Sequence, residues 1–180
     1  MNEIKKTHWR IHDYRYESLK HILSGLNNTI DSLKLRVAEK GWYDGYWLLE
    51  ESEPIFGIAF IAFQNYINGS IKDLVGDTGN KTDYYKIGDS FINTSYTRVE
   101  LIVTLANYSK HKEDGIPHKA TMAVLDAFEL DYKIDQDAAS IQDHIIFKTL
   151  DLFDKDWDLL KIMNMVTDWR KDLFELTCDN

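Results

Sequence analysis

The sequence predicts an all-α protein, a helical bundle of four to five main helices with one long loop. Apolar residues recur at intervals of three and four over several long segments, which is the period of a helix buried on one side. The 180 residues include only two prolines and nine glycines, so long helices are permitted. Where apolar and polar residues alternate over five residues, as they would in a strand, a helix explains the same residues better. We expect a single domain over residues 1–180.

The first two helices are predicted from different apolar patterns. Over residues 16–40 one apolar stripe follows the helix, and Gly41 stands where a C-terminal cap belongs. The second helix is expected to begin near Ser52, whose hydroxyl can cap it, and to end near residue 75. Residues 55–63 are apolar on every side, which places this helix at the centre of the core.

A long polar loop separates the second helix from the third. Residues 77–93 include two glycines and show no clear helical or strand period. A loop of this length in a compact domain usually carries function or is mobile. Beyond the third helix, three more helices are predicted, over residues 119–130, 141–153 and 154–177, with a polar connection at residues 131–140.

Composition disfavours several classes of protein. The formal charge of −9 and the pI near 5.1 argue against a broad surface that binds long nucleic acid, although a local basic cleft remains compatible with them. Cys178 is the single cysteine, which excludes a disulfide within the chain and a cysteine-based zinc site. The longest apolar run, residues 55–63, is about half the length of a membrane span. We therefore expect a cytoplasmic protein without a membrane partner.

Known metal and nucleotide motifs are missing from the sequence. It contains no G-x-G-x-x-G after a strand, no phosphate-binding loop and no H-E-x-x-H. The acidic residues Glu50, Glu51 and Glu53 crowd the expected start of the second helix, where carboxylates stabilise the positive end of the helix dipole. A metal-dependent phosphohydrolase would need them to meet Glu100 or Asp114. We expect no metal site and no cofactor.

The most informative stretch is residues 93–119. It predicts a heavily apolar third helix that ends in the polar cluster 107–114 and is stopped by Gly115 and Pro117. The polar residues that remain on this helix are spaced by three or four, and so fall on one stripe: Thr97, Glu100, Thr104, Asn107 and His111. We expect this stripe to face water and the candidate site to lie at its end.

Asn107 and His111 have two interpretations. They lie one turn apart on the same face, so the amide can orient the imidazole, the side chain best suited to move a proton at pH 7. Alternatively the stripe is the hydrated side of a surface helix, and Lys110, His111 and Lys112 complement the negative end of its dipole. Both interpretations remain open from the residues alone.

Aromatic, imidazole and cationic side chains crowd residues 8–16, and Arg10 and Arg15 are among them. One interpretation is an aromatic and basic patch that stacks nucleic-acid bases. The other is an N-terminal arm, residues 1–15, that packs its rings on the bundle and leaves its charges in water.

The heptapeptide LANYSKH, residues 105–111 on the third helix of a bundle, resembles the motif region of the HEPN superfamily (higher eukaryote and prokaryote nucleotide-binding domains) and of related bacterial helical proteins. Members are typically dimeric four-helix bundles, and many are metal-independent ribonucleases of toxin, abortive-infection or other defence systems. Their motif is an arginine, usually followed by a polar residue, with a histidine four to six residues after the arginine. The resemblance assigns the polar position to Asn107 and the histidine to His111, while Ala106 occupies the place of the arginine.

Without that arginine, the charge of a phosphate in the transition state would have to be stabilised by Lys110, Lys112 or an arginine from elsewhere, such as Arg10 or Arg15. The resemblance implies a homodimer with a shared cleft. It favours a non-catalytic protein- or nucleotide-binding component of a bacterial defence or toxin-antitoxin-type system.

The alternative is a metal-independent ribonuclease in which His111 is the general acid or base and Asn107 and Lys110 assist it. RNA would then be the partner. In both cases Glu100, Thr104, Lys112 and the two arginines would contribute to the binding surface.

Overall fold

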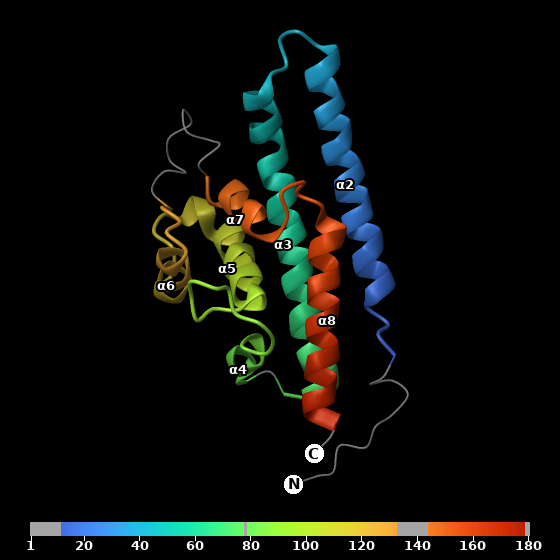
Figure 1. Cartoon of the computed structure of the whole chain (residues 1–180), viewed down its shortest axis with the longest axis vertical. Coiled ribbons are helices and arrows are strands. Elements are labelled where there is room, and N and C mark those ends of the chain that lie inside the picture. The colour runs from blue at the N-terminus through green and yellow to red at the C-terminus, as the bar shows by residue number, and fades with distance from the viewer. Residues whose placement is uncertain (1–11, 78, 133–143, 179–180) are drawn as a thin grey trace.

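The computed structural model describes residues 12–77, 79–132 and 144–178 of the chain (Figure 1). Within these ranges the protein is an all-α helical bundle, which confirms the fold class that the sequence predicts. The longer helices are α2 (Tyr16–Glu39), α3 (Gly45–Val75), α5 (Arg98–His111) and α8 (Leu159–Cys178). Shorter elements connect them, namely α4 (Lys81–Tyr85), the 3₁₀ helix η1 (Lys112–Asp114), α6 (Lys119–Ala127) and α7 (Ile145–Phe153).

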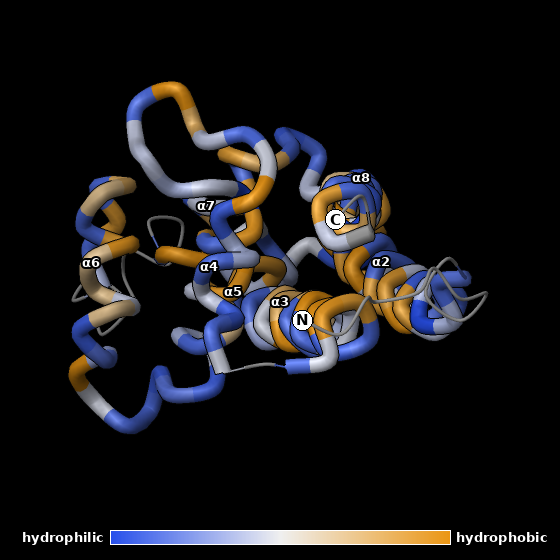
Figure 2. Tube along the Cα trace, turned by 90° about the horizontal axis from the view of Figure 1, so that it is seen from below, coloured by the Kyte–Doolittle hydropathy of each residue, from blue (hydrophilic) through white to orange (hydrophobic). Residues whose placement is uncertain are grey.

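Helix α3 lies at the centre of the bundle. It packs against α2, α5, α7 and α8, and Figure 2 shows α5 on one side of it and α2 on the other. Large side chains along its length are completely buried: Phe56, Phe60, Phe63, Ile67, Ile71 and Leu74. The central position predicted from residues 55–63 is therefore confirmed. Helices α2 and α3 form an antiparallel hairpin, and its end around residues 40–44 extends beyond the other described helices (Figure 1).

The start of α3 differs from the prediction. The helix begins at Gly45, because Asp44 caps it and its Oδ1 accepts hydrogen bonds from the backbone N–H groups of Tyr46 (3.0 Å) and Trp47 (3.2 Å). Ser52 is buried inside the helix, and its hydroxyl donates to the carbonyl of Leu49. Glu50, Glu51 and Glu53 therefore lie past the first turn of α3, where the helix dipole contributes little.

The predicted bounds of α2 are confirmed, since the helix covers Tyr16–Glu39. Gly41 does not cap it as expected. The C-cap is Lys40, in an extended conformation, so no left-handed residue is required there. A left-handed glycine cap is found instead at the end of α3, where Gly76 is the C-cap with φ of 85°.

The segment predicted as a long loop, residues 77–93, is only partly a loop, because it contains the short helix α4. The Tyr85 side chain is buried, and its hydroxyl donates to Asn68 Oδ1 of α3 at 2.6 Å. The Tyr85 carbonyl accepts from the Thr97 hydroxyl at 2.5 Å, and the Tyr84 carbonyl accepts from the Trp169 indole of α8 at 3.0 Å. The segment therefore ties α3, α5 and α8 together at the start of α5.

The last two helices begin later than their predicted ranges. Residues 154–158 form a turn in which Asp154 Oδ2 accepts from the backbone N–H groups of Asp156 and Asp158. Helix α8 then starts at Leu159, after Asp158, whose Oδ1 accepts from the Leu160 N–H at 2.8 Å. Helix α7 starts at Ile145. Most of the predicted N-terminal arm and most of the polar connection after α6 lie outside the described residues.

Candidate functional site

The polar stripe predicted on α5 is largely buried, which corrects the expectation that it faces water. Thr97 and Thr104 are both buried, and Glu100 is partly covered. Thr97 and Glu100 form a capping box: the threonine hydroxyl accepts from the Glu100 N–H at 3.1 Å, and Glu100 Oε2 accepts from the Thr97 N–H at 2.8 Å. The stripe is covered because α5 packs against α3, α4, α6 and α8.

Asn107 and Lys110 meet through Gln64, a residue of α3 that the sequence analysis missed. The Gln64 amide donates to Asn107 Oδ1 at 2.8 Å, and the Lys110 ammonium donates to Gln64 Oε1 at 2.5 Å. Burial lowers the pKa of Lys110, and the nearby charge of Lys81 lowers it further. A sequence signal for Gln64 did exist, since it is the first polar residue after the apolar run of α3.

His111 does not join this cluster. Its side chain is exposed, and its Nδ1 lies 2.8 Å from Asp114 Oδ2, one turn further along the chain. Asn107 therefore does not hold the imidazole through this nitrogen, as the one-turn spacing had suggested. The partner of Nδ1 is a carboxylate, which favours the neutral tautomer that carries its proton on Nδ1.

Asn107 and His111 nevertheless line the same depression, which we name the α5–α6 hollow. It has a volume of about 490 Å³. Its residues come from the end of α5, the turn after it and the start of α6: Asn107, Tyr108, His111, Asp114, Ile116, Pro117, His118, Ala120 and Thr121. His118 caps α6, and its Nδ1 accepts from the Ala120 N–H at 3.4 Å. In the neutral form of His118 the proton is then carried by Nε2.

Lys112 turns away from this hollow toward α3. Its ammonium donates to Glu53 Oε1 at 2.6 Å, and the other oxygen of Glu53 lies 3.5 Å from Nδ1 of the buried His144, just before α7. The carboxylate thus joins α3 to η1 and to the start of α7. This pairing neutralises the charge that Lys112 was expected to offer a phosphate.

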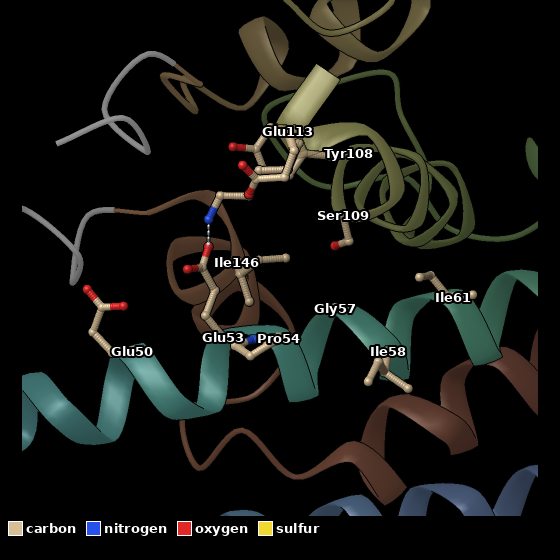
Figure 3. Close-up of a pocket in the computed structure, with 11 residues that line it drawn as sticks. Glu50, Glu53, Pro54, Gly57, Ile58, Ile61, Tyr108, Ser109, Glu113 and Ile146 are labelled. Atoms are coloured by element: carbon tan, nitrogen blue, oxygen red, sulfur yellow. Dashed lines mark hydrogen bonds and ion pairs between the residues drawn. The ribbon is translucent and has the colours of Figure 1, made fainter. Parts of the chain in front are cut away.

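A second depression, the α3–α5 hollow, surrounds the Lys112–Glu53 pair and has a volume of about 440 Å³ (Figure 3). Its lining comes mainly from α3 and the end of α5: Glu50, Glu53, Pro54, Gly57, Ile58, Ile61, Tyr108, Ser109, Lys112, Glu113 and Ile146. Ile58 is exposed here, so the all-round apolar pattern of α3 does not mean burial on every side. A Cβ at Gly57 would stand 3.2 Å from the Ser109 side chain, so the glycine permits a close approach of the two helices.

The two arginines predicted to assist the site do not join it in the described structure. Arg15 stands just before α2, where its Nε donates to Asp73 Oδ2 at 2.7 Å and its guanidinium packs on Gly69. Asp73 is about 14 Å along α3 from Gln64, which contacts Asn107 and Lys110, at 1.5 Å of rise per residue. Arg10 lies outside the described residues.

Among residues 12–77, 79–132 and 144–178, no group of three or more histidine, cysteine, aspartate or glutamate side chains is placed to hold a metal ion. The same part of the chain contains no helix with the length and hydropathy of a membrane span. Fold and site together define a helical bundle with two polar hollows beside α5. Comparison with protein-family models, curated proteins and solved structures finds no match to this chain.

Proposed function

We propose that this protein is a HEPN-like, non-catalytic component of a bacterial defence or toxin-antitoxin-type system, and that it acts by binding a partner. The observation that carries this proposal is the Gln64 bridge. Gln64 engages the Asn107 carbonyl and the Lys110 ammonium, two of the three groups that a ribonuclease mechanism would need. The bridge holds both groups against α3, so a phosphate would have to compete with Gln64 for them.

The electrostatics of α5 also support a binding role. Lys112 is neutralised by Glu53, and the described linings of both hollows contain no arginine. When the 2′-oxygen of RNA attacks the phosphate, negative charge develops on the phosphate oxygens. Cations positioned beside these oxygens stabilise that charge. The overall charge of −9 adds repulsion of RNA.

One observation favours a second candidate function, a metal-independent ribonuclease. His111 and His118 line the same hollow with opposite neutral tautomers. His111 Nε2 would accept the proton of a ribose 2′-hydroxyl while its oxygen attacks phosphorus. His118 Nε2–H would protonate the departing 5′-oxygen, which leaves a 2′,3′-cyclic phosphate.

The test is cleavage of a structured RNA by the purified protein in excess EDTA. Variants His111→Ala, His118→Ala and Asn107→Ala are run beside His21→Ala, a matched control on the exposed side of α2. Circular dichroism first establishes that each variant is folded. We expect no cleavage by any of these proteins at high enzyme concentration.

Cleavage by the wild type that falls by about 10²-fold or more in His111→Ala, with His21→Ala unaffected, would overturn the non-catalytic proposal and favour the ribonuclease. Loss in His118→Ala as well would identify the acid-base pair. Cleavage that survives both substitutions would place the activity at another site and would also overturn the proposal.

A further inference from the structure

We infer that the α3–α5 hollow is the docking site for a basic segment of a partner protein, with an arginine or lysine side chain entering between Glu50 and Glu113. This inference rests on the proposed binding function and names its surface and the chemistry of its partner. The volume of about 440 Å³ is within the range of sites that bury a small ligand or a side chain.

Charge is the first argument. Three carboxylates and one ammonium line the hollow, and the Lys112–Glu53 pair satisfies one of each. Glu50 accepts a hydrogen bond from the neutral Tyr46 hydroxyl at 3.1 Å, and within the described structure Glu113 has neither a hydrogen bond nor an ion pair. Two carboxylates therefore remain without a cation, one on α3 and one on η1. An incoming basic segment would find both carboxylates on the lining of the hollow.

The wall of the hollow is the second argument. Pro54, Ile58, Ile61 and Ile146 give it an apolar side, which suits the methylene stem of an arginine or lysine and a neighbouring apolar residue (Figure 3). A guanidinium has five N–H donors in a planar fork, so it can bind a carboxylate of the hollow through two parallel hydrogen bonds.

The adjoining surface indicates that the occupant is a protein segment. Tyr46, whose hydroxyl bonds Glu50, precedes Trp47, which forms an aromatic cluster with Trp42 and Tyr43 at the projecting end of the α2–α3 hairpin. Trp42 is 68% exposed and Trp47 is 48% exposed, and their rings stand edge to face at 6.5 Å. Exposed aromatic clusters rimmed by charge are typical of the anchor points of protein interfaces. A small cation in the hollow would leave this cluster uncovered.

The experiment measures binding of a fluorescent helical peptide that carries arginines on one face and leucines on the other, at an ionic strength of about 0.15 M. A second peptide replaces each arginine by citrulline, which has the same shape without the charge. The site variant is Glu50→Gln with Glu113→Gln. Its matched control, Glu17→Gln with Glu175→Gln, removes two exposed carboxylates at the opposite end of the bundle.

We expect the wild type to bind the arginine peptide and not the citrulline peptide. The site variant should bind about tenfold more weakly, and the control should stay within about twofold of the wild type. Amide resonances of Gly57, Ser109 and Glu113 should shift on binding. Folding of both variants is established first by circular dichroism.

Three results would overturn the inference: no binding of the arginine peptide, an equal loss in the site and control variants, or competition by arginine amide as strong as that of the peptide. The first two remove the docking site, and the third makes it a small-cation site. Each leaves the proposed function intact, because that proposal fails on RNA cleavage that depends on His111, which the peptide experiment does not measure.

Discussion

The partly buried pair formed by Glu53 and Lys112 offers a direct test of how the end of α5 is held. The Glu53 side chain is 11% exposed, that of Lys112 is 26% exposed, and that of His144 is 5% exposed. Glu53→Ala leaves the ammonium without its carboxylate at 2.6 Å. Breaking a fully buried pair costs about 3–5 kcal/mol. Because Lys112 can turn toward water, we expect about 2–3 kcal/mol for Glu53→Ala.

A double-mutant cycle isolates the pair from the loss of side-chain packing. Glu53→Ala, Lys112→Ala and the double variant are unfolded in urea while tryptophan fluorescence and helical circular dichroism are recorded. We expect a coupling free energy of about 1–2 kcal/mol. For a chain of this size, Glu53→Ala should lower Tm by about 5–10 °C.

The matched control is the exposed pair of Arg36 and Glu51, whose closest atoms are 3.3 Å apart and whose side chains are 51% and 41% exposed. Its cycle should give a coupling of about 0–0.5 kcal/mol. A coupling for Glu53 and Lys112 no larger than that of the control would refute the conclusion that this pair fastens η1 to α3.

Two further predictions concern the start of α5. Thr97→Ala should cost about 2–3 kcal/mol, because it removes the helix cap and the hydroxyl that bonds the Tyr85 carbonyl, while Thr97→Ser should retain most of the stability in the same urea assay. Equal losses of stability in Thr97→Ala and Thr97→Ser would contradict this role of the hydroxyl. Burial raises the pKa of Tyr85 from its ordinary 10.0 to about 12. Its contribution to stability should be complete below pH 10 and lost between pH 10 and 12, because the unfolded chain ionises first. The free energy of unfolding, measured across this pH window, should decline, and the decline should be smaller in Tyr85→Phe. An identical decline in both proteins would contradict the prediction.

The elements that the sequence predicted well are those with local causes. One apolar stripe is sufficient to define α2, and an apolar run on all sides is sufficient to place α3 in the core. Starts of helices were predicted less well. Asp44 and Ser52 can both cap a helix. A start at Gly45 leaves the aromatic residues after Asp44 exposed at the end of a projecting hairpin, and only the tertiary structure decides that they are exposed.

The candidate site depended more on tertiary structure. The spacing of Asn107 and His111 is a local property, and both do line one hollow. The partner of His111 is local, since Asp114 is three residues away, but Gln64 is 43 residues from Asn107 and Glu53 is 59 residues from Lys112. A period of three and four tells which residues share a face, but it does not tell whether another helix covers that face.

By itself, the sequence determined the helical class, the central helix and the presence of an alanine at position 106, because periodicity and residue identity are local properties. Packing of α3, α4, α6 and α8 around α5 decided that the stripe would be largely buried and that Lys110 and Lys112 would be bonded to α3. It also left two carboxylates of the α3–α5 hollow without a cation. Side chains distant in the chain become neighbours only when the helices pack, so these properties belong to the tertiary structure.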